Sequence, residues 1–256
     1  MKKIRIGSGA GFAGDRVDPA LTLIEHGELD YIIFECLAER TIGLARQEML
    51  HDPSKGYSRL LEYRLSQVLK PAKQHGVKII TNMGAVNPRA AVAKAMEIAR
   101  AQGITGLKFA AVTGDDVFSQ LEQYSDAPIL EFDGTVGQWT ERLVSANAYM
   151  GAEGIIQALK DGADVVITGR VADPTLTEMA QERIEEYRWG HKRGDGSEWY
   201  TIFEEYETSL RAAGENWIGS GNNPFSQIEA LMRSDGHRAN IFNEDAVYMG
   251  IGVQWN

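Results

Sequence analysis

The chain has 256 residues, of which 43% are hydrophobic and 24% charged, and its formal net charge is −10. This composition excludes a largely disordered chain and predicts a soluble protein of one large or two modest domains. The acidic balance argues against a nucleic-acid binder, which needs a basic face, and against docking on anionic lipid. No apolar run reaches the roughly 18 residues of a membrane span, and no hydrophobic leader follows the first residues. A single cysteine excludes an internal disulfide framework. We therefore expect a cytoplasmic protein.

Up to about residue 174, short apolar runs alternate with helical patterns. Strands are expected over 3–6, 31–34, 77–81, 107–112, 129–132 and 164–168. Several are β-branched at consecutive positions, as in strands covered on both faces. Helices are expected to begin at Asp18-Pro19, with Asp18 as the N-cap, at Asn87-Pro88, and at Gly151. This alternation predicts an α/β fold, with a doubly wound, mostly parallel sheet and helices on both faces.

The pattern changes after Pro174. From residue 175 onward there are 7 Lys and Arg against 14 Asp and Glu, and three of the five tryptophans follow residue 190. A shift of charge, aromatic content and periodicity at one place indicates a domain boundary near 174–190. We therefore expect an α/β domain over 1–174 and a smaller α+β domain over 175–256.

A glycine-rich turn follows the first expected strand. Its Gly9-x-Gly11-x-x-Gly14 pattern matches a dinucleotide fingerprint, and Glu35 lies 21 residues after Gly14, where a ribose-binding acid can sit. The next helix is expected to begin only at Asp18, however, and Asp15 places a negative charge where a pyrophosphate would lie. Three interpretations stay open: a turn without ligand, a site for a non-nucleotide anion or acyl group, and a dinucleotide site. The last is the least favoured, so NAD is not the expected cofactor.

Polar residues follow three further expected strands, at Thr81-Asn82, Thr113-Gly114-Asp115-Asp116 and Thr168-Gly169-Arg170-Val171-Ala172-Asp173. In an open parallel sheet, ligands bind beyond the carboxyl ends of the strands. Arg170 can hold a carboxylate or phosphate. Asp115, Asp116 and Asp173 can act as acids or bases, or hold a hydrated cation. Asn82 and the backbone of Gly9, Gly11 and Gly14 complete the expected substrate site. The alternative is structural, with Asp residues as helix caps and an Arg–Asp pair as a clip.

Cysteine and histidine residues of this region are assigned to packing and helix ends. Cys36 ends a strand, but no histidine lies near it in sequence to activate a thiolate. His26, His51 and His75 stand at expected helix ends beside Gly or Asp.

The C-terminal region contains a second constellation. His191, Glu215 and His237 each lie beside a glycine, and two imidazoles with a carboxylate suffice for a divalent metal site with an open coordination position. Their spacing is long, without a short helical His pair, so the pattern alone is a weak signal.

Several segments resemble the acyclic terpene utilisation protein family, in order and at natural spacing from residue 3 to about 176. The resemblance implies a bacterial cytoplasmic protein of citronellol- and geraniol-type isoprenoid catabolism, and it transfers no catalytic residue. The segments are Gly7-Ser8-Gly9-Ala10-Gly11-Phe12-Ala13-Gly14-Asp15-Arg16, the stretch from Asp30 to Thr41, Thr81-Asn82-Met83-Gly84-Ala85-Val86-Asn87-Pro88, and the stretches 145–152 and 162–173.

The C-terminal region resembles the CAP superfamily, of the cysteine-rich secretory and pathogenesis-related type, from near Thr177 onward. The similar segments are His191 to Ser197, Ala213-Gly214-Glu215-Asn216, Ser234 to Ile241, and Gly250-Ile251-Gly252-Val253. The resemblance implies an α–β–α sandwich in which His191, Glu215 and His237 hold a divalent cation. Leu231 replaces the usual tryptophan, Ser234 stands in place of a second cleft glutamate, and the family's first helix has no counterpart.

These observations lead to three functional hypotheses. The first is a cytoplasmic protein of acyclic isoprenoid catabolism that binds a small anionic or acyl substrate at the carboxyl ends of its sheet. The second is a CAP-type module that binds a divalent cation or lipid. The third is an inactive hybrid or truncated chain, since both resemblances are incomplete where they meet near 174–178. Whether the chain is an enzyme, and whether it forms a homo-oligomer, stays open.

Overall fold

The computed structural model describes residues 4–129, 134–172, 182–183, 186, 191–205, 215, 231 and 233–241. The chain divides into two compact units, which are described separately. One unit comprises Met1–Leu121 and Arg142–Val171, and the other comprises Glu122–Glu141 and Ala172–Asn256. The expected boundary near 174–190 stays a prediction.

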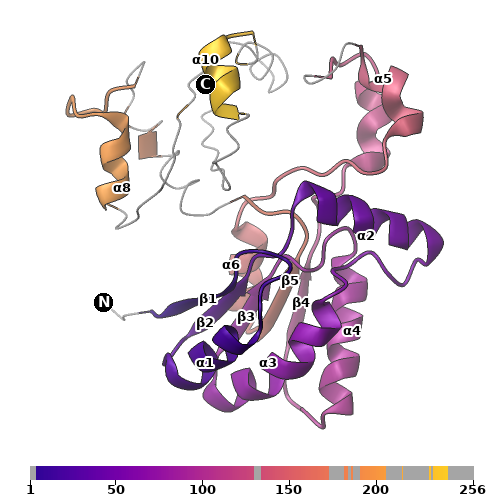
Figure 1. Ribbon diagram of the computed structural model, residues 1–256, viewed down its shortest axis with the longest axis vertical. Coiled ribbons are helices and arrows are strands. Elements are labelled where there is room, and N and C mark those ends of the chain that lie inside the picture. The colour runs from indigo at the N-terminus through magenta and orange to yellow at the C-terminus, as the bar shows by residue number, and fades with distance from the viewer. Residues whose placement is uncertain are drawn as a thin grey trace. The chain divides into compact units, whose positions relative to one another are not determined.

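The first unit is built on a five-stranded sheet in which every neighbouring pair is parallel (Figure 1). Its order is β1-β2-β3-β5-β4, so β5 lies between β3 and β4. The strands are β1 (Ile6–Ala10), β2 (Tyr31–Phe34), β3 (Lys78–Thr81), β4 (Phe109–Val112) and β5 (Val165–Thr168). The predicted α/β fold with a parallel sheet is therefore confirmed.

Four of the expected strands agree with the structure within two residues, and the other two differ from it or cannot be compared with it. The first was expected over 3–6, but β1 begins at Ile6 and includes Gly7 and Gly9. Both glycines are buried, and a Cβ on Gly9 would overlap the Phe34 ring of β2. The strand can therefore continue through glycines because the neighbouring strand fills the space above them. Of the strand expected over 129–132, only residue 129 is among the described residues.

Helices lie on both faces of the sheet, but among the described residues only the β4–β5 side of the second face is covered. The chain moves in one direction from β1 through β2 and β3 to β4, so right-handed crossovers place α1, α3 and α4 on one face. The step from β4 back to β5 reverses direction and places α6 on the other face, where it packs against β4 and β5 (Figure 1). The helices of this unit are α1 (Asp18–His26), α2 (Glu39–His51), α3 (Leu61–His75), α4 (Pro88–Ala101) and α6 (Glu153–Lys160).

Helix starts follow their local sequence. Asn87 caps α4 as expected, because its side chain accepts a hydrogen bond from the Ala90 N–H. The expectation that Asp18 caps α1 was wrong. Val17 is the N-cap without a side-chain bond, and Asp18 is the first helical residue, where its charge favours the helix dipole.

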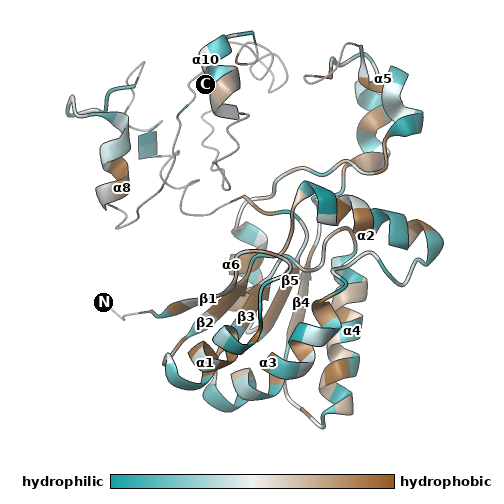
Figure 2. Cartoon of the chain, in the orientation of Figure 1, coloured by the Kyte–Doolittle hydropathy of each residue, from teal (hydrophilic) through white to brown (hydrophobic). Residues whose placement is uncertain are grey.

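The core lies between the sheet and the face formed by α1, α3 and α4. Every residue of β5 is buried. In Figure 2, the strands are mainly hydrophobic, whereas the helices show both hydrophobic and hydrophilic residues. Burying a side chain such as Leu65 contributes about 1.5–3 kcal/mol. Alanines on the inner face of α4 let this helix approach the sheet closely; these are Ala91, Ala95 and Ala99.

The described parts of the second unit contain short helical elements and a group of ion pairs around Arg183 and Arg193. They are α5 (Val136–Trp139), the 3-10 turn η3 (Trp199–Thr201), α8 (Ile202–Glu205) and α10 (Asp235–Ile241). Two further 3-10 helices, η1 (Phe118–Tyr124) and η2 (Thr140–Arg142), lie where the two units join along the chain. Arg193 is buried and pairs with three carboxylates, those of Glu182, Glu186 and Glu205.

Among the described residues of the whole chain, no helix is long and apolar enough to cross a membrane.

Candidate functional site at the carboxyl ends of β4 and β5

Asp115 and Arg170 follow β4 and β5, which are neighbours in the sheet. Asp115 is only 2% exposed, and its Oδ2 accepts hydrogen bonds from the backbone N–H of Arg170 at 2.9 Å and from Nδ2 of Asn147 at 3.0 Å. Burial raises the pKa of Asp115, and these hydrogen bonds offset part of the rise. The carboxylate therefore ties the two strand ends together and can retain a proton at a higher pH than an exposed aspartate.

A segment over residues 146–150, named here the edge strap, crosses the ends of these two strands. The Ala148 N–H donates to the Asp115 carbonyl at 2.7 Å, and the Met150 N–H donates to the Arg170 carbonyl at 3.2 Å. Because both ends of the strap are held by backbone hydrogen bonds, Tyr149 between them is placed beside the Arg170 side chain.

The Arg170 guanidinium is held in one orientation. Arg170 is 8% exposed, lies 4.6 Å above the Tyr149 ring centroid, and donates through Nη2 to the Tyr149 hydroxyl at 2.6 Å. Nη2 also contacts the carboxylate of Glu39, the first residue of α2. Nη1 is buried and has no hydrogen-bond partner within the described parts of the chain. An unpaired buried donor costs about 1–3 kcal/mol, so this edge of the sheet can gain stability from an added acceptor.

A second arginine lies at the same edge. Arg46 of α2 pairs through Nη1 with Asp116 at 3.2 Å, and its guanidinium lies 5.1 Å from the Phe118 ring centroid. Its Nε is buried and likewise lacks a partner among the residues that the structure describes. Sequence reasoning named Asp116 but missed Arg46. The only local signal was its position two helical turns after Glu39, on the same face of α2.

Sequence reasoning also gave no role to Glu39, Asn147 and Tyr149. The last two lie in the edge strap, which has no helix or strand pattern of its own. Their roles depend on contacts with residues far away in the chain, so a search for polar residues at strand ends could not find them.

At the same carboxyl edge, Asn82 follows β3, the neighbour of β5, and joins the ends of β2 and β3. Its Oδ1 accepts from the Cys36 N–H at 2.7 Å, and its Nδ2 donates to Glu35 at 2.8 Å. Asn82 therefore already has a structural role, and a ligand that binds Asn82 would have to share its side-chain amide with Cys36 and Glu35.

Cys36 is 2% exposed, and burial raises the pKa of its thiol to about 12 despite the Arg64 guanidinium 2.8 Å from Sγ. A protonated, buried thiol fits the expected packing role.

The glycine-rich turn contains its own anion. The Asp15 carboxylate accepts from the N–H groups of Gly11 at 2.9 Å and Phe12 at 3.0 Å. Gly9 lies within β1 rather than in the turn, and a Cβ on Gly14 would overlap the Phe12 ring. An anionic ligand at this turn would have to displace Asp15. The substrate-binding role of these glycines stays a prediction.

The strand order separates the glycine-rich turn after β1 from the candidate residues that follow β4 and β5. The glycine-rich turn and Arg170 both lie at the carboxyl edge, but β1 and β5 are three strand spacings apart, or roughly 14 Å. Asp115 and Arg170 are in contact, and Asp116 contacts Arg46. Asp173 lies outside the described residues.

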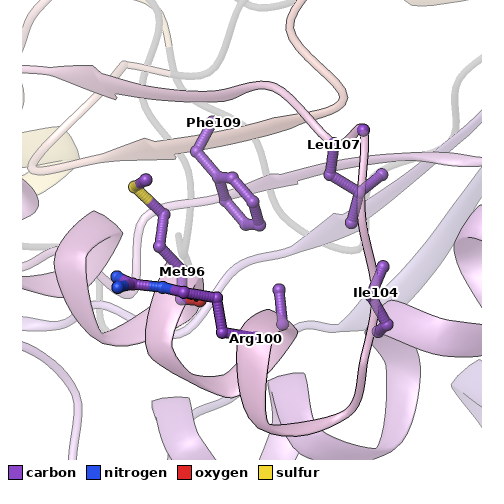
Figure 3. A pocket seen from close by; sticks show the side chains of 7 residues that line it. Met96, Arg100, Ile104, Leu107 and Phe109 are labelled. Carbon is purple, nitrogen blue, oxygen red and sulfur yellow. Dashed lines mark hydrogen bonds between the residues drawn. The ribbon is translucent and has the colours of Figure 1, made fainter.

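A pocket of about 140 Å³ lies elsewhere, at the opposite edge of the sheet (Figure 3). It lies between the C-terminal part of α4 and the start of β4, and the side chains of Met96, Leu107 and Phe109 surround it. Pockets for small-molecule ligands are commonly about 300 Å³ or larger and contain convergent polar groups. This small, mainly apolar hollow does not meet that description.

In the second unit, two of the three expected metal ligands are in contact. His191 Nδ1 lies 3.0 Å from Glu215 Oε2. Arg183, however, donates through Nε to Glu215 Oε1 at 2.8 Å. Burial opposes the charge of Arg183, but its bonds to Glu215 and Glu186 raise its pKa overall. Within the described ranges, no three His, Cys, Asp or Glu side chains are grouped to hold a metal. A cation on Glu215 would therefore have to compete with a guanidinium, so the residues present do not fit a metal without rearrangement.

Comparison with known proteins gives two family matches. Residues 4–195 match the model described as acyclic terpene utilisation family protein AtuA, and residues 171–255 match that of the cysteine-rich secretory protein family, CAP. The two matches follow the predicted order and share residues 171–195. No curated protein and no solved structure matches the chain significantly.

Proposed function

Because this chain belongs to the acyclic terpene utilisation family, we propose that it binds a small carboxylate or acyl intermediate of acyclic isoprenoid catabolism in the cytoplasm. The binding site in this proposal is the carboxyl edge of β4 and β5. Arg170 binds the anionic or carbonyl oxygen, and Asp115, whose pKa is raised by burial, exchanges a proton if the bound molecule reacts.

The buried, unpaired Nη1 of Arg170 is the observation that carries this proposal. A guanidinium binds a carboxylate through two parallel N–H donors. The Tyr149 ring already fixes the guanidinium plane, so little side-chain freedom is lost on binding. Glu39 on Nη2 has a side chain that is 82% exposed, so a ligand carboxylate can replace it at small cost.

Thermal unfolding with added ligand tests the proposal. Citronellate, geranate or a branched acyl-CoA should raise the melting temperature by several degrees, whereas NAD should not. A ligand at a hundredfold of its Kd stabilises the native state by about 2.7 kcal/mol. The Arg170→Gln variant should lose the shift, and the Arg100→Gln variant, changed at the opposite edge of the sheet, should keep it. No shift in the wild-type chain with any of the acids, or an unchanged shift in Arg170→Gln, would contradict the proposal.

The alternative function, a cation site in the second unit, rests on the 3.0 Å contact between His191 and Glu215 and would require Arg183 to move away from Glu215. Since Arg183 competes for Glu215, we expect little bound metal in the wild-type chain and more in Arg183→Ala. Metal analysis after dialysis against Zn²⁺ measures this, with His191→Ala and His237→Ala added to the Arg183→Ala background. Metal content that neither histidine substitution lowers would rule out this site.

A further inference from the structure

Arg46 and Arg170 share the same arrangement at the carboxyl edge. Each guanidinium lies over an aromatic ring, Phe118 at 5.1 Å and Tyr149 at 4.6 Å. Each side chain is largely buried, with 15% exposure for Arg46 and 10% for Arg170. Each also keeps one buried nitrogen without a hydrogen-bond partner among the described residues. Two guanidinium groups at the carboxyl edge are thus oriented by an aromatic ring and each has an unpaired donor.

Neighbouring residues keep the two arginines close together. Asp115 binds the Arg170 backbone N–H, and the next residue, Asp116, pairs with the Arg46 guanidinium. Helix α2 also links the two arginines, because it contains Arg46 and because its first residue, Glu39, pairs with the Arg170 guanidinium. Seven residues of α-helix separate these positions, or about 10 Å along the helix axis. A single molecule that engages both guanidinium groups would therefore have to be extended and to displace the carboxylates of Glu39 and Asp116.

The carboxylates that now pair with these arginines are accessible to solvent. Glu39 has 82% and Asp116 has 36% side-chain exposure. An exposed carboxylate keeps much of its hydration and gains little from its ion pair. A ligand carboxylate that reaches the buried nitrogens gains an additional hydrogen bond at each arginine. A ligand with one anionic group can satisfy only one of the two.

From this arrangement we propose that the ligand carries two anionic groups, as in a dicarboxylate, with one group on Arg170 and the other on Arg46. This inference rests on the proposed function, since it specifies the substrate class of the same site. It assigns Arg46 as a residue that selects dianionic over monoanionic ligands. Asp116 opposes binding, because it must release Arg46.

Calorimetric titration of the full chain with matched ligands tests the inference. Glutarate, suberate and sebacate are each compared with their monomethyl esters, which keep the carbon skeleton and remove one charge. At least one diacid should bind about tenfold tighter than its ester, the effect of one charge-assisted hydrogen bond. Arg46→Gln should remove this difference without weakening the ester. Arg170→Gln should weaken both ligands, and Arg100→Gln should change neither.

Asp116→Asn provides a test of opposite sign. Asparagine keeps an oxygen for the Phe118 N–H that Asp116 Oδ1 now accepts at 3.0 Å, but it no longer competes as an anion for Arg46. The diacid should then bind tighter, with the ester unchanged, even if Arg46→Gln fails to fold. If diacid and ester bind equally in the wild type and in Asp116→Asn, the dianion inference is wrong while the proposed function stands. If no diacid, ester or branched acid binds, both are wrong.

Discussion

Gly169 shows how one missing side chain permits the site to form. The residue precedes Arg170, and a Cβ built on it would overlap both carboxylate oxygens of Asp115. The Asp115 side chain can therefore lie across the end of β5 and accept the Arg170 N–H only because position 169 has no side chain. The requirement is one of space, since Gly169 does not have a positive φ.

We expect Gly169→Ala to lower the free energy of unfolding by about 1–3 kcal/mol, because overpacking forces Asp115 away from its donors. Gly43→Ala in α2 is the matched control. No atom lies within 4 Å of a Cβ built there, and its φ is not positive, so alanine should stabilise the helix by about 0.5–1 kcal/mol. Urea unfolding of both variants measures the difference. Equal effects of the two substitutions would show that the Asp115 contact is not a constraint.

The ends of several helices coincide with residues that favour helix termini. His26, His51 and His75 are the last residues of α1, α2 and α3, as the sequence suggested. Asn87 has a wider role than a cap. Its Oδ1 accepts from Ala90, while its Nδ2 donates to the carbonyls of Pro53 at 3.1 Å and Lys55 at 2.7 Å. One side chain thus starts α4 and fixes the loop that follows α2.

Asn87→Ala should therefore cost more than a simple cap, about 2–3 kcal/mol in the free energy of unfolding. Asn87→Asp keeps the acceptor for the Ala90 N–H but loses the donors to the loop, so it should fall between alanine and wild type. Denaturant titrations of the three proteins give the order. An aspartate variant as unstable as the alanine variant would mean that the loop bonds, rather than the cap, carry the stability.

At the scale of the whole molecule, the main hydrophobic core belongs to one unit. Its buried members run from Ala10 to Ile167, and all of them lie within the first unit. In the second unit, the buried residues among those described are Ala172, Arg183, Arg193 and Ile202, and the two arginines pair with carboxylates. Ion pairs of this kind contribute less net stability than apolar burial, because removing the charges from water is costly.

We therefore expect two separate unfolding transitions in differential scanning calorimetry. Ile167→Ala leaves a cavity in the first core and should lower one transition by the equivalent of about 2–5 kcal/mol. Arg193→Ala leaves carboxylates without their partner and should lower the other transition alone. A single transition that responds to both substitutions would show that the two units unfold together, contrary to the expected domain boundary.

The sequence by itself determined the class of fold, the parallel direction of the strands and the polar character of their carboxyl ends. These properties depend on local periodicity and on residues adjacent to each strand, as at Asp115 and Arg170. Only the tertiary structure decided that β5 lies between β3 and β4, which brings Arg170 to Asp115 and leaves the glycine-rich turn three strands away. The pairs Arg46–Asp116 and Arg170–Glu39 join residues 70 and 131 positions apart. Such contacts form because the whole chain must bury its apolar surface at once, and no local pattern records which distant side chains then meet.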